Sequence, residues 1–199
     1  MLSLNQRQKA ILVGTILGDG HLEQNGHHVR LRLDQGIKQA DYLAWKYGEL
    51  ENLATGKPRF IKEFHKRKNV FVERMHFSTY SDEVFDKWRA LFYKNKTKEV
   101  PRNICELLVS PLSLAVWFMD DGYKRNDCNA LRISTDSFSL REHKLLVDCL
   151  LKNFSIHSVV HKKGDAFNIY IPQASSQKFC GLIRPYIIDS LLYKVSLTP

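Results

Sequence analysis

Two carboxylates, each at the end of a short apolar run, are the residues of this chain best placed to do chemistry. The runs are residues 12–20 (LVGTILGDG) and 114–122 (LAVWFMDDG), and the carboxylates in matching places are Asp19 and Asp121. Each run is too short to cross a bilayer, and a helix that is apolar on every side must be buried. Two such helices can bury each other and bring the two acids together. The simpler alternative is a pair of unrelated core helices, each ending in an Asp-Gly cap.

Paired carboxylates predict a particular kind of site. Like charges held close together cannot both ionise cheaply, and a hard divalent cation removes that cost. Mg²⁺ takes oxygen ligands, keeps several waters, and uses one or two carboxylates together with substrate phosphate. Two such ions flanking a phosphodiester can activate a water and stabilise the leaving oxygen. The pair of acids therefore indicates a metal-dependent phosphodiesterase.

The charge of the chain indicates the kind of substrate. Its 199 residues carry a formal net charge of +9, with a pI of about 9.4, and suffice for one large domain or two small ones. Such a balance favours a polyanionic partner, which is nucleic acid or an anionic membrane. We expect no membrane association, because no amphipathic helix with a basic face and no lipidation motif is present. A generically basic soluble protein is the alternative.

The cysteines and the N-terminus indicate the compartment. Four cysteines are scattered without a C-x-x-C pair, which disfavours a zinc site and a disulfide framework and suits a reducing environment. The first residues lead directly into a predicted helix, with no signal peptide. We therefore expect a protein that acts inside the cell where it is made, in an organelle or in a bacterial or phage-infected cytoplasm, and that is not secreted.

The order of predicted elements is the same in both halves. Apolar residues alternate with charged ones over residues 28–34, which is the period of a half-buried strand. The predicted elements of the first half are a helix capped by Asn5 or Ser3 that continues into the first run, strand 28–34, helix 38–53, a hairpin of strands 59–65 and 70–78, and a helix from 83 to 92. Those of the second half are a helix after Ser110-Pro111, strand 130–135, a helix from Ser139 to 154, a hairpin of strands 156–163 and 166–171, and helix 175–183. This repeat predicts an N-terminal unit at 1–98, a linker at 99–110 and a C-terminal unit at 111–199.

The two apolar runs resemble the LAGLIDADG signature of homing endonucleases. The second run, with its proline and serine lead-in, is similar to the two-motif monomeric subgroup typified by the omega-intron endonuclease. The resemblance extends through residues 98–101 (KEVP), 136–138 (DSF), 183–186 (IRPY) and 192–194 (LYK) and covers nearly the whole chain.

The resemblance implies a fold and an activity. The fold is α+β, with two pseudo-symmetric αββαββα units, each with a four-stranded antiparallel sheet, packed through two central motif helices into a DNA-binding saddle. The implied protein is an intron-encoded monomer with an internal pseudo-twofold axis. It hydrolyses both strands of a long double-stranded DNA target and leaves 3′ overhangs, with Mg²⁺ as the cofactor and Mn²⁺ as a substitute.

The resemblance also assigns site residues. Asp19 and Asp121 match the acids that bind the metals, with the backbone carbonyls of Gly18 and Asp120 as helpers. A metal role for the Asp120 carboxylate stays open, because that acid is next to Asp121. The basic residues of the active site are Lys98 and Lys194, which are expected near the scissile phosphates.

Basic and polar side chains on outward strand faces and at hairpin tips are predicted to contact DNA. In the first half these are Arg30, Arg32, Lys66, Arg67, Lys68, Arg74 and His76, and in the second half Arg132, Ser134, His161, Lys163, Asn168 and Tyr170. The alternative for each is a solvated surface side chain.

Two other functions are open to this scaffold. One is an RNA-binding maturase that assists intron splicing, with intron RNA as partner, and the other is a catalytically silent DNA-binding module. The acids at positions 19 and 121 favour cleavage over both, since neither alternative needs metal-binding carboxylates.

Overall fold

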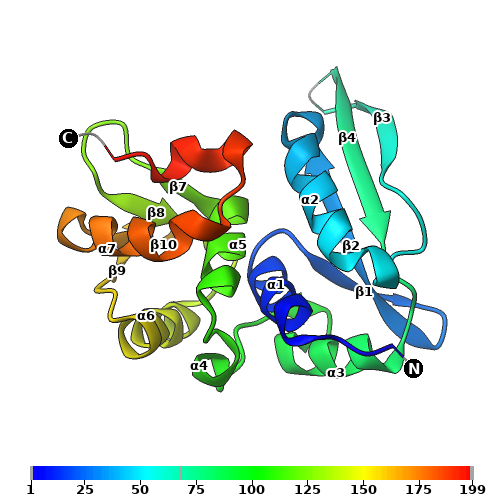
Figure 1. Ribbon diagram of the computed structural model, residues 1–199, viewed down its shortest axis with the longest axis horizontal. Helices are drawn as coiled ribbons and strands as arrows, with labels where there is room; N and C mark the ends of the chain where they lie inside the picture. The colour runs from blue at the N-terminus through cyan, green and yellow to red at the C-terminus, as the bar shows by residue number, and fades with distance from the viewer. Residues whose placement is uncertain (1, 68, 198–199) are drawn as a thin grey trace. The chain divides into compact units, whose positions relative to one another are not determined.

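The structure, a computed structural model that describes residues 2–67 and 69–197, contains two four-stranded antiparallel sheets (Figure 1). Strand order is β1-β2-β4-β3 in the first sheet and β7-β8-β10-β9 in the second. The elements of the first sheet and its helices are α1 (Gln6–Leu17), β1 (His21–Asn25), β2 (His28–Gly36), η1 (Ile37–Gln39), α2 (Ala40–Leu50), η2 (Glu51–Leu53), β3 (Arg59–His65), β4 (Val70–Ser78) and α3 (Glu83–Phe92). Those that follow are β5 (Tyr93–Lys94), β6 (Thr97–Lys98), α4 (Ile104–Leu107), α5 (Pro111–Asp121), β7 (Gly122–Lys124), β8 (Leu131–Ile133), α6 (Leu140–Phe154), β9 (Val159–Lys163), β10 (Ala166–Ile171), α7 (Gln173–Ile183), η3 (Arg184–Tyr186) and η4 (Asp189–Val195).

The predicted αββαββα order is confirmed in both halves. It runs α1-β1-β2-α2-β3-β4-α3 and then α5-β7-β8-α6-β9-β10-α7. The periodicity of the residues indicated only one strand before α2 and one before α6, and this was wrong. The missing strands, β1 and β7, lie at the edges of their sheets. Each is short, and Leu22 is the one buried apolar residue of β1, so no alternating pattern marks either strand.

Side-chain caps fix where the long helices begin. The Asn5 carboxamide accepts from the backbone N–H of Gln8, whose own carboxamide accepts from the N–H of Asn5, so α1 starts with reciprocal hydrogen bonds. Ser110 accepts from the N–H of Leu112 at the start of α5, and Pro111 occupies the first turn. These caps are the ones that the residue types predicted.

Contacts within the chain divide the described residues into two compact units. Unit 1 takes its residues from Met1–Gln8 and Asp19–Leu91, and unit 2 from Lys9–Gly18 and Phe92–Pro199. Most of motif helix α1 therefore belongs to unit 2, where it packs on α5. A Cβ added at Gly14 would overlap the Ser113 carbonyl and lie 2.8 Å from the Val116 Cβ, so the two helix backbones approach closely at this point. The predicted boundaries at 98 and 111 follow the sequence repeat instead and stay a prediction.

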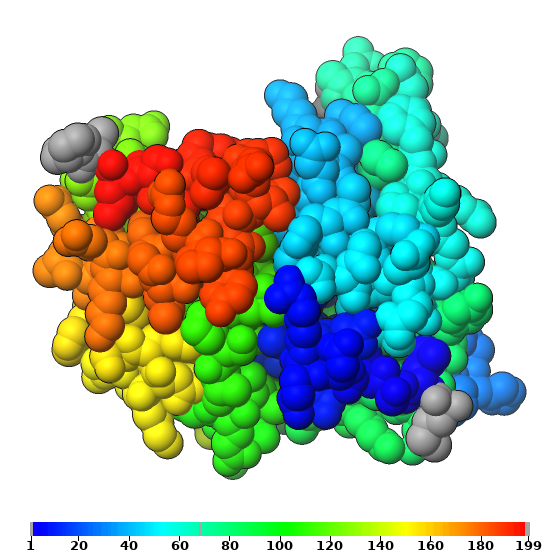
Figure 2. Space-filling view, in the orientation of Figure 1, coloured from blue at the N-terminus to red at the C-terminus, as the bar shows by residue number. Residues whose placement is uncertain are grey.

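Each sheet is covered by helices on one face. In unit 1, the inward side chains of β2 and β4, which include Leu31, Leu33 and Phe77, are buried with Tyr42 of α2 and Phe85 of α3. In unit 2, α6 packs on β9 and β10 while α7 packs on α5, and Figure 2 shows α6 in yellow and α7 with the following 3-10 turns in orange to red. This arrangement leaves the opposite face of each sheet for polar side chains. No helix in the described part of the chain is both long and apolar enough to span a membrane.

Candidate metal and nucleic-acid site

The first motif ends in an exposed carboxylate with a fixed orientation. After α1 ends at Leu17, Gly18 and Asp19 form a turn, and the Asp19 Oδ2 accepts a 2.9 Å hydrogen bond from the Gln35 Nε2 of β2. Gln35 is only 5% exposed and continues an inward row that is otherwise apolar. It was not predicted as a site residue. The sequence does hold a signal for it, because Gln35 is an amide at a position where the alternation of the strand predicts an apolar side chain.

The second motif ends in two acids with different environments. Asp121, the last residue of α5, is partly exposed, and its backbone carbonyl accepts a 2.9 Å hydrogen bond from the Ser134 N–H. Asp120 is 9% exposed. A side chain at Gly18 would overlap the Asp120 carboxylate, so glycine at position 18 is what lets the end of α1 reach Asp120 within unit 2.

Each predicted active-site lysine lies at the C-terminal end of a motif helix. The Lys98 Nζ donates to the Gly18 carbonyl at 2.8 Å, and the Lys194 Nζ donates to the Met119 carbonyl at 2.6 Å. Lys194 is buried. Cations at this end of a helix satisfy its last carbonyls and the negative end of its dipole. The two lysine contacts are not equivalent. The Gly18 carbonyl is one residue before Asp19, whereas the Met119 carbonyl is two residues before Asp121.

The oxygen donors at these helix ends fit a hard divalent cation. In unit 2 they are the carboxylates of Asp120 and Asp121 and the backbone carbonyl of Gly18, and Mg²⁺ prefers such ligands. Among the described residues no group of three or more His, Cys, Asp and Glu side chains could hold a metal by itself. A cation here would complete its coordination shell with water and phosphate, which is the usual habit of Mg²⁺.

The predicted DNA contacts of unit 1 share the uncovered face of its sheet, but they are paired with acids. The Arg30 guanidinium lies 2.6 Å from Glu23, and Arg32 and Arg74 lie 3.4 and 3.3 Å from Asp34. Strand alternation predicted the arginines and not these partners. The pairing holds each guanidinium in place and reduces the positive charge of the face.

The other predicted contacts of unit 1 lie near this face or at the hairpin tip. His76 is on β4 opposite Asp34, and its pKa is lowered by burial and by Arg32. Lys66 and Arg67 are exposed in the turn between β3 and β4. Lys68 lies outside the described residues.

In unit 2 the predicted contacts form an aromatic and basic row. The His161 and Tyr170 rings stack with centroids 4.2 Å apart, and the Arg132 guanidinium lies 5.9 Å from the Tyr170 centroid. Lys163 is 3.8 Å from Asp136. Asn168 pairs with His161 across β9 and β10 but is only 2% exposed, so in this structure its side chain offers little to a ligand. Ser134, just after β8, is partly exposed. All these assignments to DNA stay predictions.

A comparison with known families decides the family of the chain. Residues 9–179 match the model of the LAGLIDADG DNA endonuclease family. The chain belongs to this family. The matched range contains α1 from Lys9 onward, all of α5 and both sheets.

Relatives and solved structures agree with this family. The chain is 31% identical to the DNA endonuclease I-ChuI of Chlamydomonas applanata, over 98% of this chain and 97% of the relative. It is 30% identical to the cytochrome b mRNA maturase bI2 of Debaryomyces hansenii, over 96% of this chain and 74% of the relative. The structure of the homing endonuclease I-WcaI bound to its DNA recognition sequence matches with a TM-score of 0.92 at 24% identity, over 100% of this chain and 90% of that chain. The structure of I-DmoI in complex with DNA and Mn matches with a TM-score of 0.52 at 13% identity, over 96% and 97% of the two chains. The predicted family and fold class are confirmed, and so is the homing-endonuclease function at the level of the family.

The contacts of the two lysines lead to a prediction for this LAGLIDADG protein. Replacing Lys98 or Lys194 by methionine keeps the length of the side chain and removes the ammonium beside the helix end. We expect DNA cleavage to slow by about 100-fold or more, the lower range for a lost proton-transfer or charge-stabilising group, while DNA affinity changes little. Single-turnover cleavage and a binding titration measure the two effects. Lys124→Met is the matched control, because the Lys124 Nζ also donates to a backbone carbonyl of unit 2, that of Ser196 at 2.8 Å. If cleavage by Lys124→Met slows equally, Lys98 and Lys194 have no special role in catalysis and serve only to cap the helices.

Proposed function

We propose that this protein is a site-specific DNA endonuclease that uses divalent metal to hydrolyse both strands of a long duplex target, leaving 3′ overhangs. The observation that carries the proposal is the close packing of Gly18 on Asp120, with the Lys98 ammonium bound to the Gly18 carbonyl. It gathers an acid, a backbone carbonyl and a cation at the ends of the motif helices.

The proposed roles follow from the contacts of each residue. Asp19 and Asp121 are metal ligands, and Gln35 holds the Asp19 carboxylate in one orientation through the 2.9 Å hydrogen bond. The bound cation would polarise the scissile phosphate and lower the pKa of an attacking water. Lys98 and Lys194, fixed on helix carbonyls, are available to stabilise charge or orient that water. Arginines and aromatic rings on the two sheets grip the phosphate backbone and the bases.

The choice of metal rests on the donor set and on a structural relative. Oxygen donors without imidazole or thiolate favour Mg²⁺, and Mn²⁺ accepts the same ligands. The presence of Mn in the I-DmoI complex with DNA supports divalent metal use in this fold. We propose Mg²⁺ as the resident ion, with Mn²⁺ able to replace it, in a protein that acts as an intracellular monomer.

Cleavage of a randomised plasmid library tests the function. With Mg²⁺ present we expect a small set of plasmids to be cut at one place each, with 3′ overhangs revealed by sequencing of the ends. With EDTA in place of Mg²⁺ we expect no cutting, because the carboxylates alone cannot activate water. Absence of cutting with both Mg²⁺ and Mn²⁺ would contradict the proposal.

The maturase relative keeps one second candidate open. A cytochrome b mRNA maturase is 30% identical over almost the whole chain, so this chain can be proposed to assist splicing of an intron RNA. The two functions separate by experiment. A protein that accelerates splicing of the intron around its gene and cuts no DNA would be a maturase, whereas metal-dependent cutting identifies the endonuclease.

A further inference from the structure

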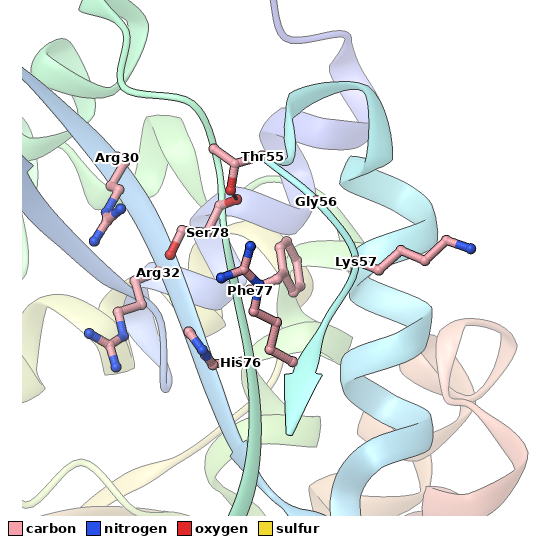
Figure 3. Close-up of a pocket in the computed structure, with 9 residues that line it drawn as sticks. Arg30, Arg32, Thr55, Gly56, Lys57, His76, Phe77 and Ser78 are labelled. Carbon is pink, nitrogen blue, oxygen red and sulfur yellow. Dashed lines mark hydrogen bonds between the residues drawn. The ribbon is translucent and has the colours of Figure 1, made fainter. Parts of the chain in front are cut away.

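A basic hollow lies on the outward face of the unit 1 sheet, where β2 and β4 meet the loop before β3 (Figure 3). Its volume is about 140 Å³. The residues that line it are Arg30, Arg32, Thr55, Gly56, Lys57, Arg59, His76, Phe77 and Ser78. The volume is well above the roughly 10–15 Å³ that one water needs and below the roughly 300 Å³ at which pockets for small molecules begin. The hollow therefore suits a group the size of a phosphate and not a whole nucleotide.

The loop before β3 is tied to the sheet and forms one wall of the hollow. Both the backbone N–H and the hydroxyl of Thr55 donate to the Ser78 carbonyl, at 2.9 and 3.1 Å. Figure 3 shows Thr55 beside Ser78, and the side chain of Lys57 pointing away from the other labelled residues. The wall is thus preformed, and the positive charge inside comes from arginines and not from Lys57.

Acids of the same face pair with two of the three arginines that line the hollow. Arg30 is bound by Glu23, and Arg32 by Glu23 and Asp34. Arg59 differs, since within residues 2–67 and 69–197 no carboxylate pairs with it. Its guanidinium is a planar donor that matches a phosphate oxygen pair, so among the arginines of the hollow it is the one whose donors are not already engaged by a described carboxylate.

We propose that this hollow seats one phosphodiester group of the bound DNA, with Arg59 as its main ligand and the Ser78 hydroxyl as a second donor. The inference rests on the proposed function and deepens it. It assigns a backbone contact to a residue that strand alternation did not single out. A phosphate held at a preformed wall sets the register of the duplex on the unit 1 sheet, which base contacts alone do not fix.

His76 gives the seat a second, independent signature. Its pKa is lowered by burial and by Arg32 of β2, Arg59 of β3 and Arg74 of β4, and Asp34 of β2 opposes them. Its buried Nδ1 lacks a hydrogen-bond partner among the described residues. A phosphate in the hollow brings negative charge beside the ring and raises the pKa of His76. Between the lower pKa of the free protein and the higher pKa of the complex, binding takes up a proton, so DNA affinity rises as the pH falls through this window.

The seat is tested by pairing protein variants with DNA linkages. The probe is a set of duplexes of the target recovered from the plasmid library, each with one uncharged methylphosphonate linkage. Among the linkages that the wild-type protein contacts, we expect one whose neutralisation weakens wild-type binding about tenfold but has no effect on the Arg59→Ala variant. Arg59→Ala should weaken binding of the unmodified duplex by a similar factor. Neutralising that one linkage should not weaken binding of this variant further, whereas other linkages should keep their effects. It should also lower the slope of log affinity against log salt by about 0.9.

Two further variants separate the seat from general charge. Lys87→Ala removes one positive charge at an exposed position of α3, where Lys87 pairs with Glu83, and should leave the affinity, slope and linkage pattern unchanged. Arg59→Lys keeps the charge and should restore the salt slope. His76→Gln should abolish the rise in affinity at low pH while Arg59→Ala reduces it.

Several outcomes would overturn the seat. One is that Arg59→Ala and each uncharged linkage weaken DNA binding independently, so that no linkage loses its effect in the variant. Another is that the effect of Arg59→Ala disappears when one base pair of the target is changed and not when a linkage is neutralised, which would show that Arg59 contacts a base. Inorganic phosphate is the second probe, and a phosphate affinity that Arg59→Ala abolishes without any linkage effect would assign the hollow to a free anion. A wild-type protein that neither binds nor cuts DNA overturns the proposed function, whereas one that cuts normally without the linkage effect overturns only the seat.

Discussion

Replacing Asp121 by asparagine is expected to abolish DNA cleavage and leave DNA binding intact. Asparagine has nearly the same shape, but its amide carries no charge and is a poor ligand for Mg²⁺. A metal that stabilises the transition state contributes several kcal/mol, and a loss of about 4 kcal/mol is a roughly 1000-fold slower reaction. Single-turnover cleavage in Mg²⁺, with binding measured separately in EDTA, gives the two numbers.

The same substitution has a distinctive effect on stability. Asp121 is the last residue of α5, where a carboxylate meets the negative end of the helix dipole at a cost of about 0.3–1 kcal/mol. Without metal, the asparagine variant should therefore be no less stable than the wild-type protein. The wild-type protein should gain stability with added Mg²⁺ through binding to its folded state, and the variant should gain less. A residue kept only for the fold would show the opposite pattern.

Asp148→Asn is the matched control for this prediction. Asp148 is exposed on α6 of the same unit, and the exchange makes the same change of charge at a position away from the motif helices. We expect normal cleavage and a normal response to Mg²⁺. Full activity of Asp121→Asn would remove Asp121 from the metal site, and equal loss in the control would reveal a general charge effect.

The sequence predicts those parts of the molecule that local patterns specify. Caps are local, so Ser110 and Ser139 start their helices as predicted, and Asn5 is the one of the two predicted caps, Asn5 and Ser3, that starts α1. The hairpin of β3 and β4 is also local, with apolar alternation and a polar turn. The edge strands β1 and β7 are not predicted, because a strand of three to five residues is too short to show an alternating pattern and is stabilised by pairing with its neighbour.

Contacts across strands are the part that the sequence does not predict. Alternation tells which side of β2 carries Arg32, but the register decides that Asp34 lies opposite His76. It likewise decides that Asn168 is buried beside His161, although both are on the uncovered face. The Gln35 contact with Asp19 joins residues sixteen apart and depends on how α1 ends. Residue types therefore predict which chemical groups the site contains. The orientation of these groups and the balance of their charges depend on strand register and on side-chain contacts, which the sequence does not predict.

The close approach of the motif helices gives a prediction in which one substitution has opposite effects at two glycines. In an open helical position alanine is more favourable than glycine by about 1 kcal/mol. Gly181 in α7 is such a position, since an added Cβ meets nothing within 4 Å. At Gly14 in α1 the added Cβ would overlap the Ser113 backbone carbonyl and lie 2.8 Å from the Val116 Cβ. A carbonyl within a helix cannot rotate away, so α1 and α5 must separate.

We expect Gly181→Ala to stabilise the protein by up to about 1 kcal/mol and Gly14→Ala to destabilise it by about 1–3 kcal/mol, the usual cost of overpacking. For a chain of this size each kcal/mol moves the melting temperature by about 2–4 °C, so thermal and urea unfolding resolve the two signs. Cleavage should also fall for Gly14→Ala, because a shifted α1 moves the Gly18 carbonyl away from Asp120 and from the Lys98 ammonium. Equal stabilisation by both alanines would mean that α1 and α5 do not touch at Gly14. That result would also contradict the placement of the Gly18 carbonyl beside Asp120 and Lys98, because this placement depends on the same helix packing.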